Sequence, residues 1–173
     1  MNTYKNNYKM KSIKLFFLVM LFILPSCESH DIQQNYDIDK VIANNNQKIT
    51  IKTGLTGTLL KKEGNCMPSP VNSSCKQYPV SRSIYIFDYS TLKNVVGYGP
   101  FFTSVNSNLI GKCKADDEGF FQFSLSPGKY SIFILEDNKY FANGLDGLGG
   151  INPVIVKADS VITIKLILDY AVY

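Results

Sequence analysis

Residues 116–132, with the sequence DDEGFFQFSLSPGKYSI, decide the fold predicted for this chain. Three acidic residues lead into Gly119, and apolar residues then alternate with polar ones at Phe121, Phe123 and Leu125. This period of two is typical of a strand with one buried face. A Pro-Gly pair at 127–128 precedes a second apolar run, and proline followed by glycine favours a tight turn in which the glycine takes a positive φ. The segment therefore predicts two strands joined as a hairpin.

The same pattern of short strands and turns extends over residues 49–173. Alternating apolar residues recur from Ile162 to Leu168, whereas Ser83–Phe87 is apolar on both faces and should be a central strand. No helical stripe exceeds two turns. We expect an all-β sandwich of about seven strands, near residues 50–60, 82–89, 109–115, 119–125, 129–137, 153–157 and 160–170.

The acidic-x-x-Gly-x-Phe-x-Phe run that ends in Pro-Gly-x-Tyr resembles the carboxypeptidase regulatory-like domain. The stretches GLTG at 54–57 and PVSRSIYI at 79–86 are similar to that family's first two strands. The resemblance implies a transthyretin-like (prealbumin-like) Greek-key β-sandwich over most of residues 50–170. It implies no peptidase activity, because such domains are accessory modules. The chain departs from the family at residues 61–77 and 95–108, which are longer here.

The N-terminus predicts a lipid anchor. Four lysines precede the apolar run LFFLVMLFIL at 15–24, which is too short for a stable membrane span, and the run ends in LPSC at 24–27. That ending resembles the lipobox of bacterial lipoproteins, in which the cysteine, here Cys27, is acylated. An ordinary secretory signal is the alternative. We expect a signal peptide at 1–26 and a flexible, Asn/Gln-rich tether at 27–48, on an outer-membrane protein facing the periplasm or the cell surface.

Charge and composition exclude several functions. The net charge of +4 arises within the first 27 residues, and the remainder carries 14 basic and 14 acidic residues, so no nucleic-acid surface is indicated. The only histidine, His30, falls in the expected tether. A Ser/His/Asp or Cys/His nucleophilic site and a His-ligated zinc site therefore lack their most common component. We expect no enzyme activity, no metal and no cofactor.

Three cysteines remain beyond Cys27. Cys66 and Cys75 flank the loop CMPSPVNSSC, and we predict a disulfide between them. A bridge from one of them to Cys113 is the alternative. Otherwise Cys113, which lies between two lysines, should point inward as a small buried residue.

The loop at 137–150 is the candidate ligand-binding segment. Tyr140 and Phe141 offer rings for stacking, and Asn143 and Asp146 offer hydrogen bonds, a set suited to sugars or peptides. The alternatives are a plain connection whose aromatic residues plug the end of the core, and a calcium site built on its oxygen donors.

Two other segments have competing interpretations. The acids at 116–118 could act as catalytic carboxylates, although a solvated turn is the simpler explanation. Tyr98, Phe101 and Phe102 could form an exposed aromatic patch, but covering a sheet edge suits them better.

The sequence thus favours a membrane-anchored envelope lipoprotein that acts as a non-catalytic binding or scaffolding module. Its expected partners are the membrane, through the lipid, and an envelope protein or a glycan. A hydrolase that uses carboxylates alone and a purely structural envelope component are the alternatives.

Overall fold

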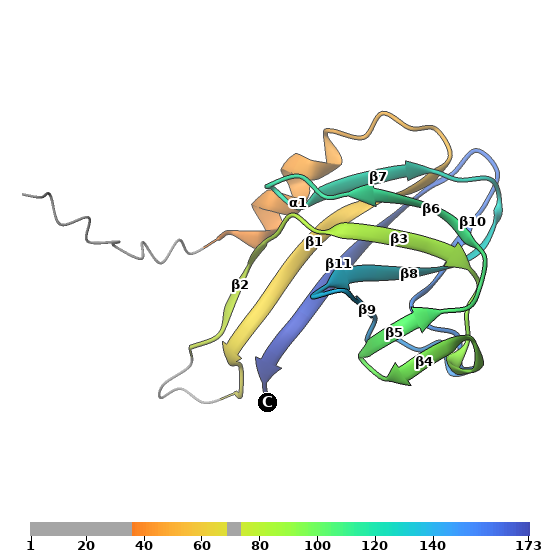
Figure 1. The fold of residues 1–173 in the computed structure, drawn as a ribbon. Helices are drawn as coiled ribbons and strands as arrows, with labels where there is room; N and C mark the ends of the chain where they lie inside the picture. The colour runs from red at the N-terminus through yellow and green to blue at the C-terminus, as the bar shows by residue number, and fades with distance from the viewer. Residues whose placement is uncertain (1–35, 69–73) are drawn as a thin grey trace, which may run out of the picture. The chain divides into compact units, whose positions relative to one another are not determined.

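The protein is an all-β sandwich of two sheets with one short helix (Figure 1). The computed structural model describes residues 36–68 and 74–173. The predicted signal peptide, the lipid-attachment residue Cys27 and the first part of the tether lie outside these residues. The elements, in chain order, are α1 (Ile38–Asn46), β1 (Gly54–Asn65), β2 (Lys76–Pro79), β3 (Ser83–Asp88), the 3₁₀ turn η1 (Leu92–Asn94), β4 (Val95–Tyr98), β5 (Phe101–Val105), β6 (Leu109–Lys114), β7 (Phe120–Ser124), β8 (Gly128–Glu136), β9 (Lys139–Phe141), β10 (Pro153–Val156) and β11 (Val161–Val172).

The first sheet, sheet A, is built around β1. Strand β11 runs parallel to β1 along its whole length, from Gly54 opposite Val161 to Asn65 opposite Val172. The other edge of β1 is shared between two antiparallel strands, β7 along its first half and β2 along its second half. Gly57 permits this close arrangement, because a Cβ there would lie 2.0 Å from the carbonyl oxygen of Ile164 on β11.

The second sheet, sheet B, has the strand order β4-β5-β9-β8-β3-β6, with β10 also paired to β8. All its pairings are antiparallel. Strand β3 lies between β8 and β6, which confirms that Ser83–Phe87 is a central strand. A two-residue turn joins β8 to β9, and both of its residues, Asp137 and Asn138, have positive φ, as tight hairpin turns of this kind require.

The main core fills the space between the two sheets. The predicted alternation is confirmed in sheet A, because the apolar residues of β7 and β11 belong to this core. Sheet B contributes the matching residues of β3 and β8. The fully or nearly fully buried members are Leu55, Leu59, Ile84, Ile86, Phe121, Ile132, Ile134, Phe141 and Leu168.

The predicted hairpin at Pro127-Gly128 is wrong. Strand β7 pairs with β1 in sheet A, whereas β8 belongs to sheet B, so the turn carries the chain across the sandwich. Gly128 is not among the glycines with positive φ. The Tyr130 hydroxyl donates a hydrogen bond to the carbonyl oxygen of Ser126, 2.9 Å away, and a similar tyrosine bond marks corners of Greek-key sandwiches. Both strands have an apolar face, and facing sheets bury those faces better than one two-stranded hairpin would.

The flexible tether predicted at 27–48 is wrong for residues 38–46, which form helix α1. Asp37 caps the helix by accepting a hydrogen bond from the Lys40 amide. Near the other end, the buried Asn45 side chain donates to Thr58 Oγ1 at 3.0 Å and to the Glu118 carbonyl oxygen at 2.9 Å. These bonds hold the helix against the sandwich. The sequence did not indicate this helix, because its buried contact is made by Asn45 and not by an apolar stripe.

A second apolar cluster lies on the other face of sheet B. It consists of Phe87, Phe102, Phe133, Ala142 and Ile151, with the side chains of Tyr85, Val95, Val105 and Tyr140 packed against it. Strands β4, β5 and β9 supply part of this layer. All seven expected strands are present, and these three together with β2 are the ones the sequence analysis did not predict.

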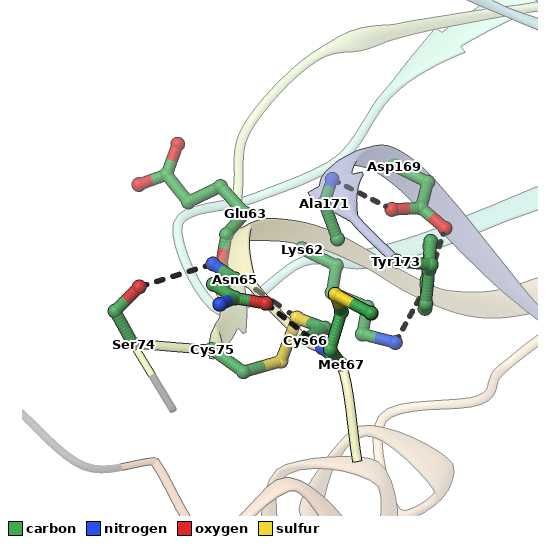
Figure 2. Close-up of a disulfide and its surroundings, with 10 residues drawn as sticks. All are labelled: Lys62, Glu63, Asn65, Cys66, Met67, Ser74, Cys75, Asp169, Ala171 and Tyr173. Carbon is green, nitrogen blue, oxygen red and sulfur yellow. Dashed lines mark hydrogen bonds between the residues drawn. A yellow bond between two sulfur atoms is a disulfide. The ribbon is translucent and has the colours of Figure 1, made fainter. Parts of the chain in front are cut away.

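The predicted disulfide between Cys66 and Cys75 is confirmed (Figure 2). It joins the chain just after β1 to the chain just before β2, and the Asn65 amide donates to Ser74 Oγ beside it. Closing a loop of this size contributes about 3 kcal/mol on the chain-entropy model. Cys113 is free and packs against the main core. Burial raises the pKa of its thiol to about 11, so the thiol stays protonated and unreactive at neutral pH.

Candidate binding surface

The four residues predicted to bind a ligand do not form one site. Tyr140 and Phe141 are neighbours on β9, so their side chains point to opposite faces of sheet B. Phe141 is 1% exposed and belongs to the main core. It therefore plugs the core, as the alternative interpretation of this loop expected, and is not available to a ligand.

Asp146 stabilises the loop that contains it. One carboxylate oxygen accepts hydrogen bonds from the amides of Leu148 and Gly150, and the other accepts from the Tyr89 hydroxyl at 2.8 Å and from Lys129 Nζ at 3.1 Å. Lys129 Nζ also lies 3.6 Å from the centre of the Tyr89 ring. With both oxygens engaged, Asp146 acts as a structural residue in this conformation. Asn143 is exposed in the same loop.

We expect these contacts to make the stability of the loop depend on pH. The hydrogen bond from Tyr89 lowers the pKa of Asp146 well below its usual range. The two amides and Lys129 lower it further, and partial burial opposes the shift without cancelling it. A lowered pKa stabilises the fold above the unfolded-state pKa of about 4, and this contribution is lost as the pH falls towards the folded-state value. Asp146→Asn should therefore lower the urea midpoint at neutral pH, and the gap from the native chain should narrow in acid. A gap that widens in acid would contradict this role.

Tyr140 takes part in a different surface, on the outer face of sheet B. Its ring packs edge-on against Tyr85 of β3, with centroids 5.3 Å apart. Leu135 of β8 is paired with Tyr140, and Lys112 of β6 is paired with Tyr85, so these side chains share the face. We call Tyr85, Leu135, Tyr140 and Lys112 the tyrosine platform.

Buried aromatic residues support the tyrosine platform from one side. Phe133 is fully buried and packs edge-on against Phe87, Phe102 and Tyr140. Both platform tyrosines are only partly buried, and Lys112 is exposed. The second cluster therefore covers part of this sheet face and leaves the tyrosine platform partly exposed.

The chemistry of the tyrosine platform suits a ligand with apolar faces and hydroxyl groups. Lys112 Nζ lies 5.9 Å from the centre of the Tyr85 ring. Burial and the neighbouring Tyr85 raise the pKa of Tyr140, so its hydroxyl remains a neutral donor and acceptor at physiological pH. Rings of this kind stack on apolar surfaces, while the hydroxyl and ammonium groups make hydrogen bonds.

Sequence reasoning missed Tyr85 and Lys112 as candidate residues. A signal was present, because residues 83–87 are apolar on both faces, which requires both faces of that strand to have a partner layer. Lys112 and Lys114 flank the inward-pointing Cys113, which places both lysines on the same face as Tyr85. Only strand pairing, however, brings Tyr85 next to Tyr140, 55 residues further along the chain.

The acidic residues at 116–118 form a turn that is stabilised by Lys48, which follows helix α1 in the chain. Asp116 accepts hydrogen bonds from the amides of Glu118 and Phe120, and Lys48 pairs with both Asp116 and Glu118. Gly119, with φ of 75°, completes the turn. These carboxylates therefore serve the connection between β6 and β7, in agreement with the turn interpretation.

Residues 36–68 and 74–173 show few other features that could bind a ligand or a membrane. These residues contain no group of three or more His, Cys, Asp and Glu side chains placed to hold a metal ion. A shallow depression of about 510 Å³ is lined by Lys52, Thr53 and the β7–β8 turn. The one α-helix of this part of the chain is not long and apolar enough to cross a membrane.

The fold and surface define a β-sandwich domain with an aromatic layer on the outer face of one sheet. Comparisons with protein-family models, with curated proteins and with solved structures found no match.

Proposed function

We propose that this protein is a lipid-anchored envelope protein whose sandwich binds a glycan, without catalysis, on the tyrosine platform. The observation that carries the proposal is the incompletely covered aromatic face of sheet B, where Tyr85 and Tyr140 remain partly exposed. Single exposed apolar residues are common on protein surfaces and need no explanation. Several aromatic rings that pack together and remain exposed are instead typical of a binding surface.

A glycan suits the tyrosine platform better than a hydrolysed substrate does. Sugar rings have an apolar face that stacks on aromatic side chains, and their hydroxyls match the phenol and ammonium groups of the platform. A hydrolase would need carboxylates facing a cleft. Asp116, Glu118 and Asp146, which were considered for that role, are held by amides or lysines in turns, which supports a non-catalytic module.

Binding is tested on an array of bacterial and plant polysaccharides. Tyr85→Ala and Tyr140→Ala should each weaken the affinity for whichever glycan the native chain binds by about tenfold or more, as expected for a central aromatic contact. Tyr98→Ala is the matched control, because Tyr98 is 94% exposed on β4 and lies outside the tyrosine platform. No glycan signal from the native chain, or equal losses in all three variants, would overturn the proposal.

The membrane anchor rests on the LPSC ending at residues 24–27 and on the lysines and apolar run before it. Acyl chains on Cys27 would hold the domain at the membrane, since more than one chain gives stable anchoring. Cys27→Ala should move the protein from the membrane fraction to the soluble fraction and abolish incorporation of a labelled fatty acid. Unchanged labelling would contradict an anchor at this residue.

A further inference from the structure

The outer edge of β11 is free for pairing. Among the strands the structure describes, β11 pairs only with β1, along all twelve residues from Val161 to Val172. The carbonyl oxygens of Ser160 and Val172 bond towards the β1 side, to the amides of Gly54 and Cys66. Even-numbered residues therefore direct their backbone groups to β1, and odd-numbered residues direct theirs outward. In Figure 1, β11 extends beside β1 to the C-terminus.

We propose that β11 pairs antiparallel with β11 of a second copy of this chain, about a two-fold axis at Ile167. Ile167 is odd-numbered, so its amide and carbonyl point to the free edge and would bond with those of Ile167 in the second copy. The two sheets A would then join into one continuous sheet. An interface around a two-fold axis brings the same surface together from both chains.

Charge complementarity selects this register. Lys165 is exposed and forms no ion pair among the described residues. The Asp169 carboxylate accepts bonds from the Ala171 amide and the Tyr173 hydroxyl, both drawn in Figure 2, and has no cationic partner there. With the axis at Ile167, Lys165 of each copy lies opposite Asp169 of the other.

The other registers lack this pairing. An axis at Leu166 or Leu168, the two adjacent registers, would place Lys165 or Asp169 opposite Ile167 and form no ion pair. An axis at Lys165 or Asp169 would place two lysines or two carboxylates opposite each other. Like charges directly opposite one another destabilise a strand pair, while opposite charges stabilise it. Only the register centred on Ile167 forms two equivalent ion pairs.

Apolar contacts on the inner face of β11 favour the same register. It would place Val172, which is 63% exposed, opposite Ile162 of the second copy, and Tyr170, which is 39% exposed, opposite Ile164. Ile162 and Ile164 are only partly buried in the single chain although they pack against the main core. Pairing would therefore extend that core across the axis, because the exposed end of each strand covers the incompletely buried start of the other.

Pairing between two copies would also cover the exposed outer edge of β11. Long apolar edge strands tend to pair with other chains unless charges or bulges protect them. The bond from the Ala171 amide to its own neighbour Asp169 occupies one outward amide of the edge. In the dimer that amide would bond across the axis to Thr163, and the Asp169 carboxylate would turn to Lys165.

The test uses the full chain in mild detergent, analysed by sedimentation over a dilution series. The native chain should dimerise. Lys165→Glu and Asp169→Lys should each raise the dimer dissociation constant by about tenfold or more, because each places like charges opposite one another at two sites. An equimolar mixture of the two variants should dimerise again, since the mixed pair restores one Lys–Asp and one Glu–Lys contact.

The mixture is the decisive control. A variant that had failed to fold would not be rescued by mixing, and association through the apolar N-terminal run would not depend on residues 165 and 169. A native chain that stays monomeric over the whole series would overturn the proposal. Dimers that persist in both single variants, or single variants that stay monomeric when mixed, would also overturn it.

Discussion

Phe133→Ala is expected to lower the free energy of unfolding by about 3–5 kcal/mol, the usual cost of deleting a buried phenylalanine ring. Phe133 is fully buried and contacts Phe87, Phe102 and Tyr140 at centroid distances of 5.6, 6.2 and 6.1 Å. Its removal leaves a cavity at the centre of the second cluster, between β8 and the loops that cover it. Urea unfolding followed by tyrosine fluorescence measures the loss.

Phe133→Leu and Tyr98→Ala serve as controls. The leucine fills most of the space and should cost clearly less than the alanine. Tyr98 is exposed, so its replacement should change stability by less than about 0.5 kcal/mol. If Phe133→Ala were as harmless as Tyr98→Ala, the second cluster would not be a structural layer, and the tyrosine platform would lose its support.

The ion pair between Arg82 and Glu136 should show an asymmetric response to mutation. Arg82 Nε donates to Glu136 Oε2, and the carboxylate side chain is only 8% exposed whereas the arginine side chain is 39% exposed. Arg82→Met leaves a buried carboxylate without its cation and should cost about 2–4 kcal/mol, below the upper limit for a buried pair because water partly screens this one. Glu136→Gln should cost roughly 1 kcal/mol, since the guanidinium can turn towards water.

The double variant Arg82→Met with Glu136→Leu separates charge from packing. Removing both partners leaves no buried unpaired charge, so the double variant should be more stable than Arg82→Met alone. The comparison is made by urea unfolding of the native chain, Arg82→Met, Glu136→Leu and the double variant. Additive losses would show that the two side chains do not act as a pair.

The two proposed interaction surfaces lie on different parts of the fold. The tyrosine platform belongs to the outer face of sheet B, while the free edge of β11 belongs to sheet A. Substitutions at one surface leave the contacts of the other intact. Dimer formation and glycan binding can therefore be measured independently, and the failure of one proposal would not decide the other.

Much of the architecture followed from local patterns. Alternation at 121–125 and 162–168 predicted strands with one buried face, and the spacing of Cys66 and Cys75 predicted the disulfide. These features depend on neighbours in the chain, because side chains of a strand alternate whatever sheet it joins and a short loop brings its own ends together. The two-residue turn at 137–138 carried a similar signal, from which the missed strand β9 could have been predicted.

Which strands pair and which side chains meet could not be predicted from local patterns. The Pro-Gly turn at 127–128 looked like a hairpin, yet its strands joined different sheets. Phe141 and Tyr140 looked like one stacking pair, yet adjacent residues of a strand face opposite ways, and only the position of β9 in sheet B decides which of them is buried. Asp146 looked like a ligand residue until Tyr89 and Lys129 came within hydrogen-bonding distance of it.

The sequence by itself therefore determined an all-β chain, seven of its strands, the disulfide and the neutral charge of residues 28–173. Periodicity, loop length and charge are local or additive properties, so these features could be predicted from the sequence alone. Tertiary structure alone decided that α1 docks through Asn45, that Tyr85 meets Tyr140, and that one edge of β11 has no partner strand among the described residues. Each of these results depends on which distant segments pack together, because the free energy of burying a face is gained only when both partners are present.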